Sequence, residues 1–373
     1  MMFRRQGTLV AASLFLSISA LAVTARAQVS SSPPSDKPED LVPKQFLGLV
    51  HAPEVYAELN LSPGQIKNLD ALFDRVDGDW FRARIYPADA QKARQSKVEA
   101  VVRQWFKSNA SAAQVKRLKQ LEHRSQGIRM LLTPEIRQQL SLNASQVSEL
   151  VELAKAANEA TAKLQQATMK NAVTEELKSA VVKAAQAEQG ALQSVLKPEQ
   201  VQQLGAILGK PFDTTKLKRI YPKAPELVPV DEWINSSGLT LRELRGKVVL
   251  VHFYAFQCHN CHANFDHYRR WHDKYGDDVV VIGIQTPETP SERDPAAVRS
   301  AAQKRQLEFP ILVDLESKNW KSWSNTMWPT VYVIDKKGYI RHWWQGELNW
   351  NGATGDKTIE DLVADLLKEK SDV

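Results

Sequence analysis

Cysteine is scarce in this sequence of 373 residues, where it occurs only at Cys258 and Cys261. A fold held together by disulfides carries many cysteines in a short chain. A bridge between two residues three positions apart would close too small a loop to stabilise a chain of this length. The composition therefore excludes a disulfide scaffold, and chemistry is the better explanation for the pair.

Two further features are missing. No run of lysine or arginine alternates with aromatic residues, so nothing in the sequence supports nucleic-acid binding. After the N-terminal region, no apolar stretch approaches the ~20 residues that a membrane-spanning helix needs. The net charge of +6 includes Arg4, Arg5 and Arg26, so a chain that starts at Gln28 would carry +3.

The first residues predict export. Arg4 and Arg5 precede an apolar stretch at 9–23, and Ala25, Arg26 and Ala27 form the small-x-small pattern of a signal-peptidase site. We expect a signal peptide at 1–27 and a periplasmic or otherwise extracytoplasmic protein. The alternative is that the stretch stays uncleaved and anchors the chain in a membrane. No cysteine follows the stretch, which excludes a lipoprotein anchor.

The rest of the chain divides by composition. Residues 28–45 hold little that a core could bury and predict a disordered tether. Residues 46–209 have the periodicity of an all-α domain, and 210–229 form a proline-rich linker that breaks this periodicity. Strand and helix patterns then alternate through 230–373, which predicts a separate α/β domain.

Similar helix starts recur in the helical domain. Each combines a capping residue with a proline or glutamine and an apolar stripe; they begin at Ser62, Ser111, Thr133, Asn143 and Lys197. They resemble, weakly, the LTxxQ motif of some periplasmic helical proteins, including small stress chaperones. The long segment at 158–193 has only a thin apolar stripe. A plain scaffold and a partner-binding, chaperone-like module therefore both stay open.

The two cysteines lie where a strand pattern changes to a helix pattern. The run 247–257 is apolar and rich in β-branched residues, whereas Phe265, Tyr268 and Trp271 recur at helical spacing. A sulfur at a helix N-terminus faces unpaired amide groups that favour the thiolate. We therefore expect Cys258 to be the nucleophile and Cys261 the resolving thiol.

The α/β domain is predicted in more detail from its local patterns. The expected strands are 248–256, 279–284, 311–313, 331–334 and 339–344, and the expected helices are 258–275, 294–306 and 358–368.

With these elements the domain resembles the thioredoxin superfamily, in its TlpA-like and DipZ C-terminal (redoxin) branch. The resemblance is carried by Cys258, His259, Asn260 and Cys261, by the segment 281–288, and by Trp328, Pro329 and Thr330. It implies a thioredoxin fold and a thiol-disulfide oxidoreductase that acts on protein thiols and disulfides without a cofactor or metal. It also implies that Pro329 follows a cis peptide bond opposite the cysteines, and that Trp328 presents the substrate backbone.

The sequence departs from thioredoxin around the cysteines. Gln257 replaces a tryptophan, and His259 and Asn260 replace the usual glycine and proline. His259 is a candidate stabiliser of the Cys258 thiolate, which would make the redox potential less reducing than that of thioredoxin. His252 takes the place of a buried aspartate and is either a proton relay or a core histidine. Glu288 is the other candidate proton acceptor, or a plain surface carboxylate.

Several alternatives use the same residues. Cys258, Cys261 and His262 also spell the C-x-x-C-H of c-type haem attachment, and with nearby histidines they could bind copper or zinc. A peroxiredoxin would carry threonine or serine at 255 and proline at 251, where this chain has Ala255 and Val251. The redox partner, the client and the direction of electron flow are not encoded in any motif.

Overall fold

The computed structural model describes residues 37–214, 217 and 220–369. The expected signal peptide at 1–27 and the first part of the expected tether, up to residue 36, lie outside the described residues. The rest of the expected tether, 37–45, is not disordered: it contains a 3-10 helix at Pro38–Leu41, and Leu41 and Val42 pack against the core of the helical region.

The described residues form two compact units, one of 37–66 and 103–220 and the other of 67–102 and 221–369. Residues 67–102, which the sequence pattern assigns to the helical domain, thus cluster with the α/β domain. The second part of the predicted linker, from residue 221, also belongs to this unit, because Ala224 and Leu227 are buried in its core. In the part of the chain described, no helix has the length and hydrophobicity required to cross a bilayer.

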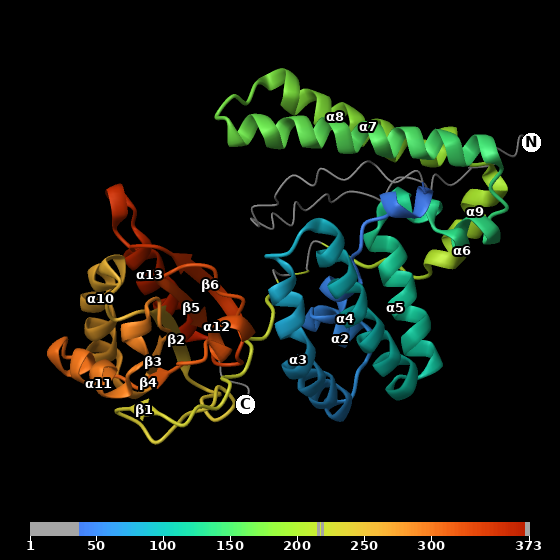
Figure 1. Cartoon of the computed structure of the whole chain (residues 1–373). Coiled ribbons are helices and arrows are strands. Elements are labelled where there is room, and N and C mark those ends of the chain that lie inside the picture. Colours follow the sequence, from blue (N-terminus) through green and yellow to red (C-terminus); the bar gives the residue numbers. More distant parts are fainter. Residues whose placement is uncertain (1–36, 215–216, 218–219, 370–373) are drawn as a thin grey trace, which may run out of the picture. The chain divides into compact units, whose positions relative to one another are not determined.

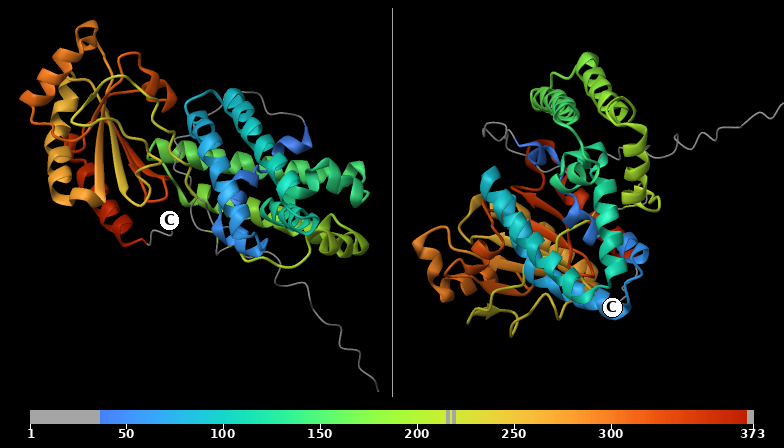
Figure 2. Two further views of the ribbon diagram at one scale, coloured as in Figure 1. Left: turned by 90° about the horizontal axis from the view of Figure 1, so that it is seen from below. Right: turned by 90° about the vertical axis from the view of Figure 1, so that its right-hand side faces the viewer.

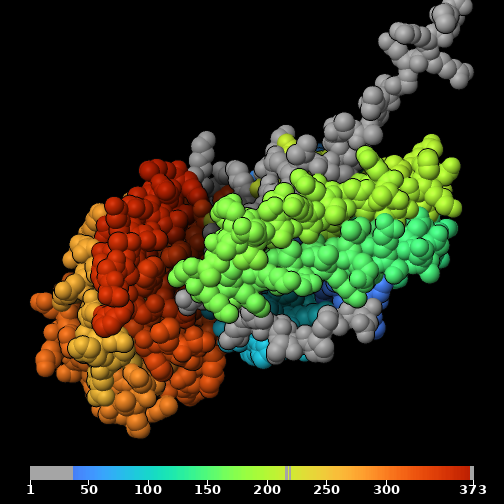
Figure 3. Space-filling model, turned by 90° about the horizontal axis from the view of Figure 1, so that it is seen from above, coloured from blue at the N-terminus to red at the C-terminus, as the bar shows by residue number. Residues whose placement is uncertain are grey.

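The N-terminal region is all-helical, as predicted (Figure 1). Its elements are η1 (Pro38–Leu41), α1 (Phe46–Val50), α2 (Pro53–Glu58), α3 (Pro63–Ala83), α4 (Ala88–Asn109), α5 (Ala112–Ser125), η2 (Gly127–Leu132), α6 (Pro134–Gln139), α7 (Ala144–Met169), α8 (Glu175–Ser194) and α9 (Pro198–Leu208). Helices α7 and α8 lie side by side as a long hairpin (Figure 3).

The recurring helix starts belong to a tandem repeat. A short helix, a residue with positive φ and a capped long helix occur first at α2, Asn60 (φ 50°) and α3, and again at α6, Ser141 (φ 49°) and α7. In each copy two motif glutamines bond to each other. Gln65 Nε2 donates to Gln114 Oε1 at 3.1 Å, and Gln146 Nε2 donates to Gln200 Oε1 at 2.8 Å. The glutamines therefore join the starts of two long helices in each repeat.

The C-terminal unit is built on a six-stranded mixed sheet of order β1-β4-β3-β2-β5-β6 (Figure 2). Its elements are β1 (Trp233–Ile234), β2 (Val248–Tyr254), α10 (His259–Tyr275), η4 (Gly276–Asp278), β3 (Val279–Gln285), η5 (Pro290–Arg293), α11 (Pro295–Lys304), β4 (Ile311–Val313), α12 (Lys318–Ser322), β5 (Thr330–Ile334), β6 (Ile340–Gln345), η6 (Trp350–Gly352) and α13 (Gly355–Lys368). Every strand and helix predicted for this domain is present, and β1 and α12 are additional.

Strand β2 lies in the middle of the sheet and is buried over its whole length. It pairs in parallel with β3 and antiparallel with β5. Val248 and Leu250 face the core made with α10, α11 and α13, whereas Val249 and Val251 face a second core. Burial on both faces explains why the strand lacks the alternation of apolar and polar residues that a half-buried strand shows.

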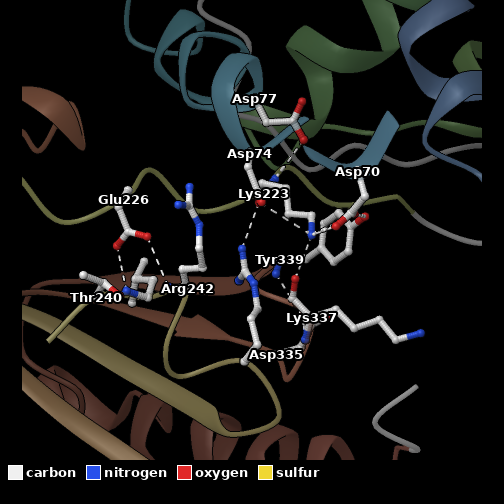
Figure 4. Close-up of polar contacts among 12 residues, drawn as sticks. Asp70, Asp74, Asp77, Lys223, Glu226, Thr240, Arg242, Asp335, Lys337 and Tyr339 are labelled. Carbon is white, nitrogen blue, oxygen red and sulfur yellow. Dashed lines mark hydrogen bonds and ion pairs between the residues drawn. The ribbon is translucent and has the colours of Figure 1, made fainter. Parts of the chain in front are cut away.

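Helix α3 is held in this unit by a buried lysine. The Lys223 side chain is 2% exposed, and its Nζ lies 2.9 Å from Asp70 Oδ1 and 2.9 Å from the carbonyl oxygen of Lys337 (Figure 4). The Lys223 backbone N–H donates to Asp77 Oδ2 at 3.0 Å. Arg245 pairs with Asp74 at 2.9 Å. Because these carboxylates lie one turn apart along α3, one face of the helix contacts the beginning of the α/β domain.

Candidate redox site

The cysteines lie at the junction between β2 and α10, as the sequence pattern predicts. The strand ends at Tyr254, a short turn follows, and Cys258 is the N-cap residue of α10. The N–H of Cys261 donates to the Cys258 carbonyl at 3.1 Å, which closes the first turn of the helix. Both cysteines are free thiols. The site is therefore described in its dithiol form.

The two sulfurs have opposite electrostatic environments. A hydrogen bond from the Cys261 thiol lowers the pKa of Cys258, helped by the backbone N–H groups of Cys261 and Asn260 and opposed by partial burial and the charge of Glu288. Burial raises the pKa of Cys261, whose side chain is almost inaccessible, and its hydrogen bond to Cys258 adds to the rise. Cys258 is thus the more acidic and accessible of the two.

The Trp328–Pro329 peptide bond is cis, which confirms the prediction from the resemblance. Thr330 pairs with Phe253 in the antiparallel ladder of β5 with β2, so Pro329 lies at the end of β2 where the turn to Cys258 begins. Trp328 and Cys258 both pack against the same core. The Trp328 ring stacks on Trp320, with the ring centroids 4.0 Å apart.

His252 is fully buried in an aromatic cage. Its ring stacks on Tyr268 with centroids 3.9 Å apart and on Tyr254 at 5.2 Å, and the edge of Phe309 closes the cage. Burial lowers the pKa of His252 to about 3, so the ring is neutral. Neither ring nitrogen has a hydrogen-bond partner among the described residues. This environment favours the core-histidine interpretation over the proton relay.

The other candidates lie at the surface of the site. His259 and Glu288 are both exposed. The carboxylate of Glu288 is close enough to both sulfurs that its charge raises the pKa of each thiol. Of the two proposed proton acceptors, Glu288 is the one whose charge acts on the cysteines.

Glu292 is a site residue that sequence reasoning missed. Its buried carboxylate accepts hydrogen bonds from the N–H groups of Gln257 at 2.7 Å, Glu288 at 2.7 Å and Thr289 at 3.0 Å. It therefore ties the residue before Cys258 to the loop that carries Glu288. The detectable signal was the capping box from Thr289 to Glu292.

Asn264, one turn beyond Cys261, was also missed. Its Nδ2 donates to the carbonyl of Gly346 at 3.2 Å, and its Oδ1 accepts from the N–H of Leu348 at 2.9 Å. The N–H of Gly346 in turn donates to the Pro329 carbonyl at 2.8 Å. Helix α10 and the cis-proline loop are thus connected through the segment that follows β6.

Of the residues proposed for haem or metal, His262 is engaged in other contacts. His262 Nε2 donates to the Phe256 carbonyl at 2.7 Å, and Arg305 Nη2 donates to His262 Nδ1 at 2.9 Å. No three His, Cys, Asp or Glu side chains are grouped to hold a metal ion anywhere in the described residues. Coordination by Cys258, Cys261 and His262 would first have to break the contacts of His262.

A dithiol at a helix N-terminus, a neighbouring cis-proline and this strand order define a thioredoxin-superfamily domain. Residues 223–343 match the model of the AhpC/TSA family. The chain is 30% identical over 146 residues to the thiol-disulfide oxidoreductase YkuV of Bacillus subtilis, covering 39% of this chain and 94% of that protein. It is also 36% identical over 150 residues to protein DipZ of Mycobacterium bovis, covering 39% of this chain and 21% of DipZ.

A solved structure of a thiol-disulfide isomerase from Corynebacterium glutamicum is 27% identical, with a TM-score of 0.36, and covers 39% of this chain and 98% of that one. The chain belongs to the thioredoxin superfamily, through a TlpA- and DipZ-like redoxin domain at its C-terminus. It spans about a fifth of the length of the DipZ proteins that it matches.

Proposed function

We propose that the chain is an exported thiol-disulfide oxidoreductase whose CHNC dithiol acts on protein substrates. The observation that carries the proposal is the opposite shift of the two thiols, with a lowered pKa at accessible Cys258 and a raised pKa at buried Cys261. The oxidoreductase name of YkuV, most of whose length this chain covers, supports it. Export rests on the predicted signal peptide at 1–27.

The proposed exchange uses both sulfurs in turn. The Cys258 thiolate attacks one sulfur of a substrate disulfide, and the other substrate sulfur leaves as a thiolate that takes up a proton. Cys261 then loses its proton and attacks the Cys258 sulfur, which releases the second substrate thiol. The substrate gains two electrons, and the protein is left with a Cys258–Cys261 disulfide. The reverse sequence oxidises a substrate dithiol.

Other residues have proposed supporting roles. Glu288 is the better-placed acceptor for the Cys261 proton, since its charge already acts on both sulfurs. Trp328 and Pro329 present the substrate backbone beside Cys258, and proline has no N–H that would compete there. His259 stabilises the thiolate from the exposed side. We therefore expect a redox potential above the roughly −270 mV of thioredoxin.

Trapping tests the proposal directly. A Cys261→Ser variant should accumulate mixed disulfides with its clients at Cys258, because no resolving thiol remains to release them. These adducts should appear by mass spectrometry and vanish with reductant. The Cys258→Ser variant, which keeps the buried thiol, is the matched control and should trap nothing. If native protein reacts at neither thiol with alkylating agent or disulfide, the enzyme function is wrong.

A further inference from the structure

The end of α3 contacts the segments that precede and follow the cis-proline. The Phe81 side chain is 5% exposed, and its ring meets the rings of Tyr332 and Trp343 edge-on at 5.9 Å each. One residue along, Arg82 Nη1 donates to the carbonyl of Ser322, at the end of α12, at 2.9 Å. The helix thus touches the chain on both sides of Trp328–Pro329.

A chain of hydrogen bonds extends from Arg84, in the turn directly after α3, to the residue before Trp328. Arg84 Nη2 donates to the Tyr332 hydroxyl at 3.3 Å, and that hydroxyl donates to Asn325 Oδ1 at 2.8 Å. Asn325 Nδ2 donates to the Met327 carbonyl at 3.4 Å. The hydroxyl of Thr330, next to Pro329, donates to the same carbonyl at 2.8 Å.

Arg84 is placed for this contact rather than for solvent. Its guanidinium lies 3.4 Å from the centroid of the Phe81 ring, and its Nη1 donates to the Phe81 carbonyl at 2.7 Å. Among the described residues no carboxylate forms an ion pair with it. The contacts that hold the Arg84 guanidinium are therefore the face of the Phe81 ring and the hydroxyl of Tyr332, and it fixes these two groups relative to each other.

We propose that Phe81 and Arg84 are positioning residues for the substrate-binding loop at 327–329. This inference rests on the proposed function and assigns part of the alignment of Trp328 to the end of α3 and the turn that follows it. The groups that shift the pKa of Cys258 lie in α10 and at Glu288, not in α3. Loss of the contact should therefore weaken capture of protein disulfides and leave the acidity of Cys258 unchanged.

The test compares Arg84→Met with Arg75→Met in the full-length reduced protein. Arg75 is an exposed arginine on α3, two turns before the helix ends, so it controls for the loss of a positive charge from this part of the chain. Each variant is assayed with a protein disulfide, insulin, and with a small disulfide, oxidised glutathione. Alkylation of Cys258 as a function of pH reports its pKa. Amide hydrogen exchange over 324–332 reports the order of the loop without any activity.

For Arg84→Met we expect the second-order rate constant for the reduction of insulin by the reduced protein to fall about threefold to tenfold, a size typical of coupling between two places in a protein. The rate with oxidised glutathione and the alkylation profile should not change, while exchange over 324–332 becomes faster. Tyr332→Phe should behave in the same way, and Arg84→Lys should restore part of the loss. Arg75→Met should match the native protein in every assay.

Two results would overturn the inference. In one, insulin kinetics and amide exchange are unchanged in Arg84→Met. In the other, the rates with both disulfide substrates fall and the pKa of Cys258 changes as well, which indicates general damage to the site rather than a loss of positioning. Failure of the proposed function would give a different result, because the native protein itself would react with neither disulfide. Amide exchange over 324–332 would then be the measurement that tests whether Phe81 and Arg84 order the loop.

Discussion

Helices α3 and α7 hold the same place in the two helical repeats, but their second halves have different surroundings. In α3, Asp77 and Phe81 are buried in the C-terminal unit. In α7, the buried residues end at Ala157, and the remainder of the helix lies along α8. Two helices at equivalent places in the repeats therefore differ in their surroundings: the end of α3 contacts the redox domain, whereas the end of α7 forms an exposed hairpin with α8.

The largest expected effect is on the packing of α3. Phe81→Ala removes a buried ring and should lower the free energy of unfolding by about 3 to 4 kcal/mol, the usual cost of such a cavity. Leu164→Ala, at a half-buried position in the second half of α7, should cost less than ~1 kcal/mol. Urea unfolding followed by circular dichroism measures both. Equal losses would remove the distinction between the two helices.

Acid should lower the free energy of unfolding of the C-terminal unit, because His252 is buried in it as a neutral ring. The folded pKa of about 3 lies below the unfolded value near 6.5, so the unfolded chain binds a proton that the folded chain excludes. Stability is therefore complete above about pH 6.5 and falls by up to ~1.4 kcal/mol per pH unit towards pH 3. Replacing the ring in His252→Phe should flatten this part of the pH profile.

His123 in the other unit provides the comparison for this pH experiment. Burial also lowers its pKa, but the neighbouring Gln126 side chain and nearby carboxylates oppose the shift. His123→Phe should therefore flatten the profile less than His252→Phe does. Urea midpoints measured between pH 4 and pH 8 would show the order, and the reverse order would contradict the cage described for His252.

The buried Lys223, which contacts α3, should contribute more to the stability of the fold than the exposed Lys163 on α7. Lys223→Met leaves Asp70 and Asp74 without their buried partner and should cost about 2 kcal/mol, below the 3 to 5 typical of fully buried pairs because Asp70 is half exposed. Lys163→Met breaks an exposed pair with Glu159 on α7 and should leave the unfolding midpoint unchanged. Thermal unfolding compares the two variants.

The smallest difference is expected between the two glutamine pairs. Gln146 is 8% exposed and bonds to both Gln200 and the Val195 carbonyl, so Gln146→Ala should cost about 1 to 2 kcal/mol. Gln65, in the first repeat, is only half-buried and bonds to Gln114 and to the Asn109 carbonyl, so Gln65→Ala should cost about half as much. A larger loss of stability in Gln65→Ala than in Gln146→Ala would show that the first repeat depends more on its glutamine pair than the second does.

Much of the redox domain could be predicted from local patterns. The apolar run into β2, the helical spacing after Cys261 and the turn before β6 each depend on neighbouring residues, and the structure contains all three. The cis bond before Pro329 was predicted only through the family resemblance. The signal peptide and the roles of His259 and Glu288 stay predictions.

The packing of α3 could not be predicted in this way. In the sequence, the acidic face of α3 has the pattern of an ordinary solvent-exposed surface. Its partner is far away in the chain: the hydrogen bond from Lys223 to Asp77 spans 146 positions. Periodicity shows that a helix has a polar face but not what that face meets. The same applies to His252, whose neutral state follows from rings contributed by α10 and by the segment before β4.

The sequence alone determined the elements, the dithiol and its place at a helix start, because these depend on residues within a few turns of one another. Tertiary structure decided which sulfur is accessible, which carboxylate acts on it and which helix supports the cis-proline loop. Those outcomes depend on burial and on contacts between distant segments, and both exist only once the chain has folded.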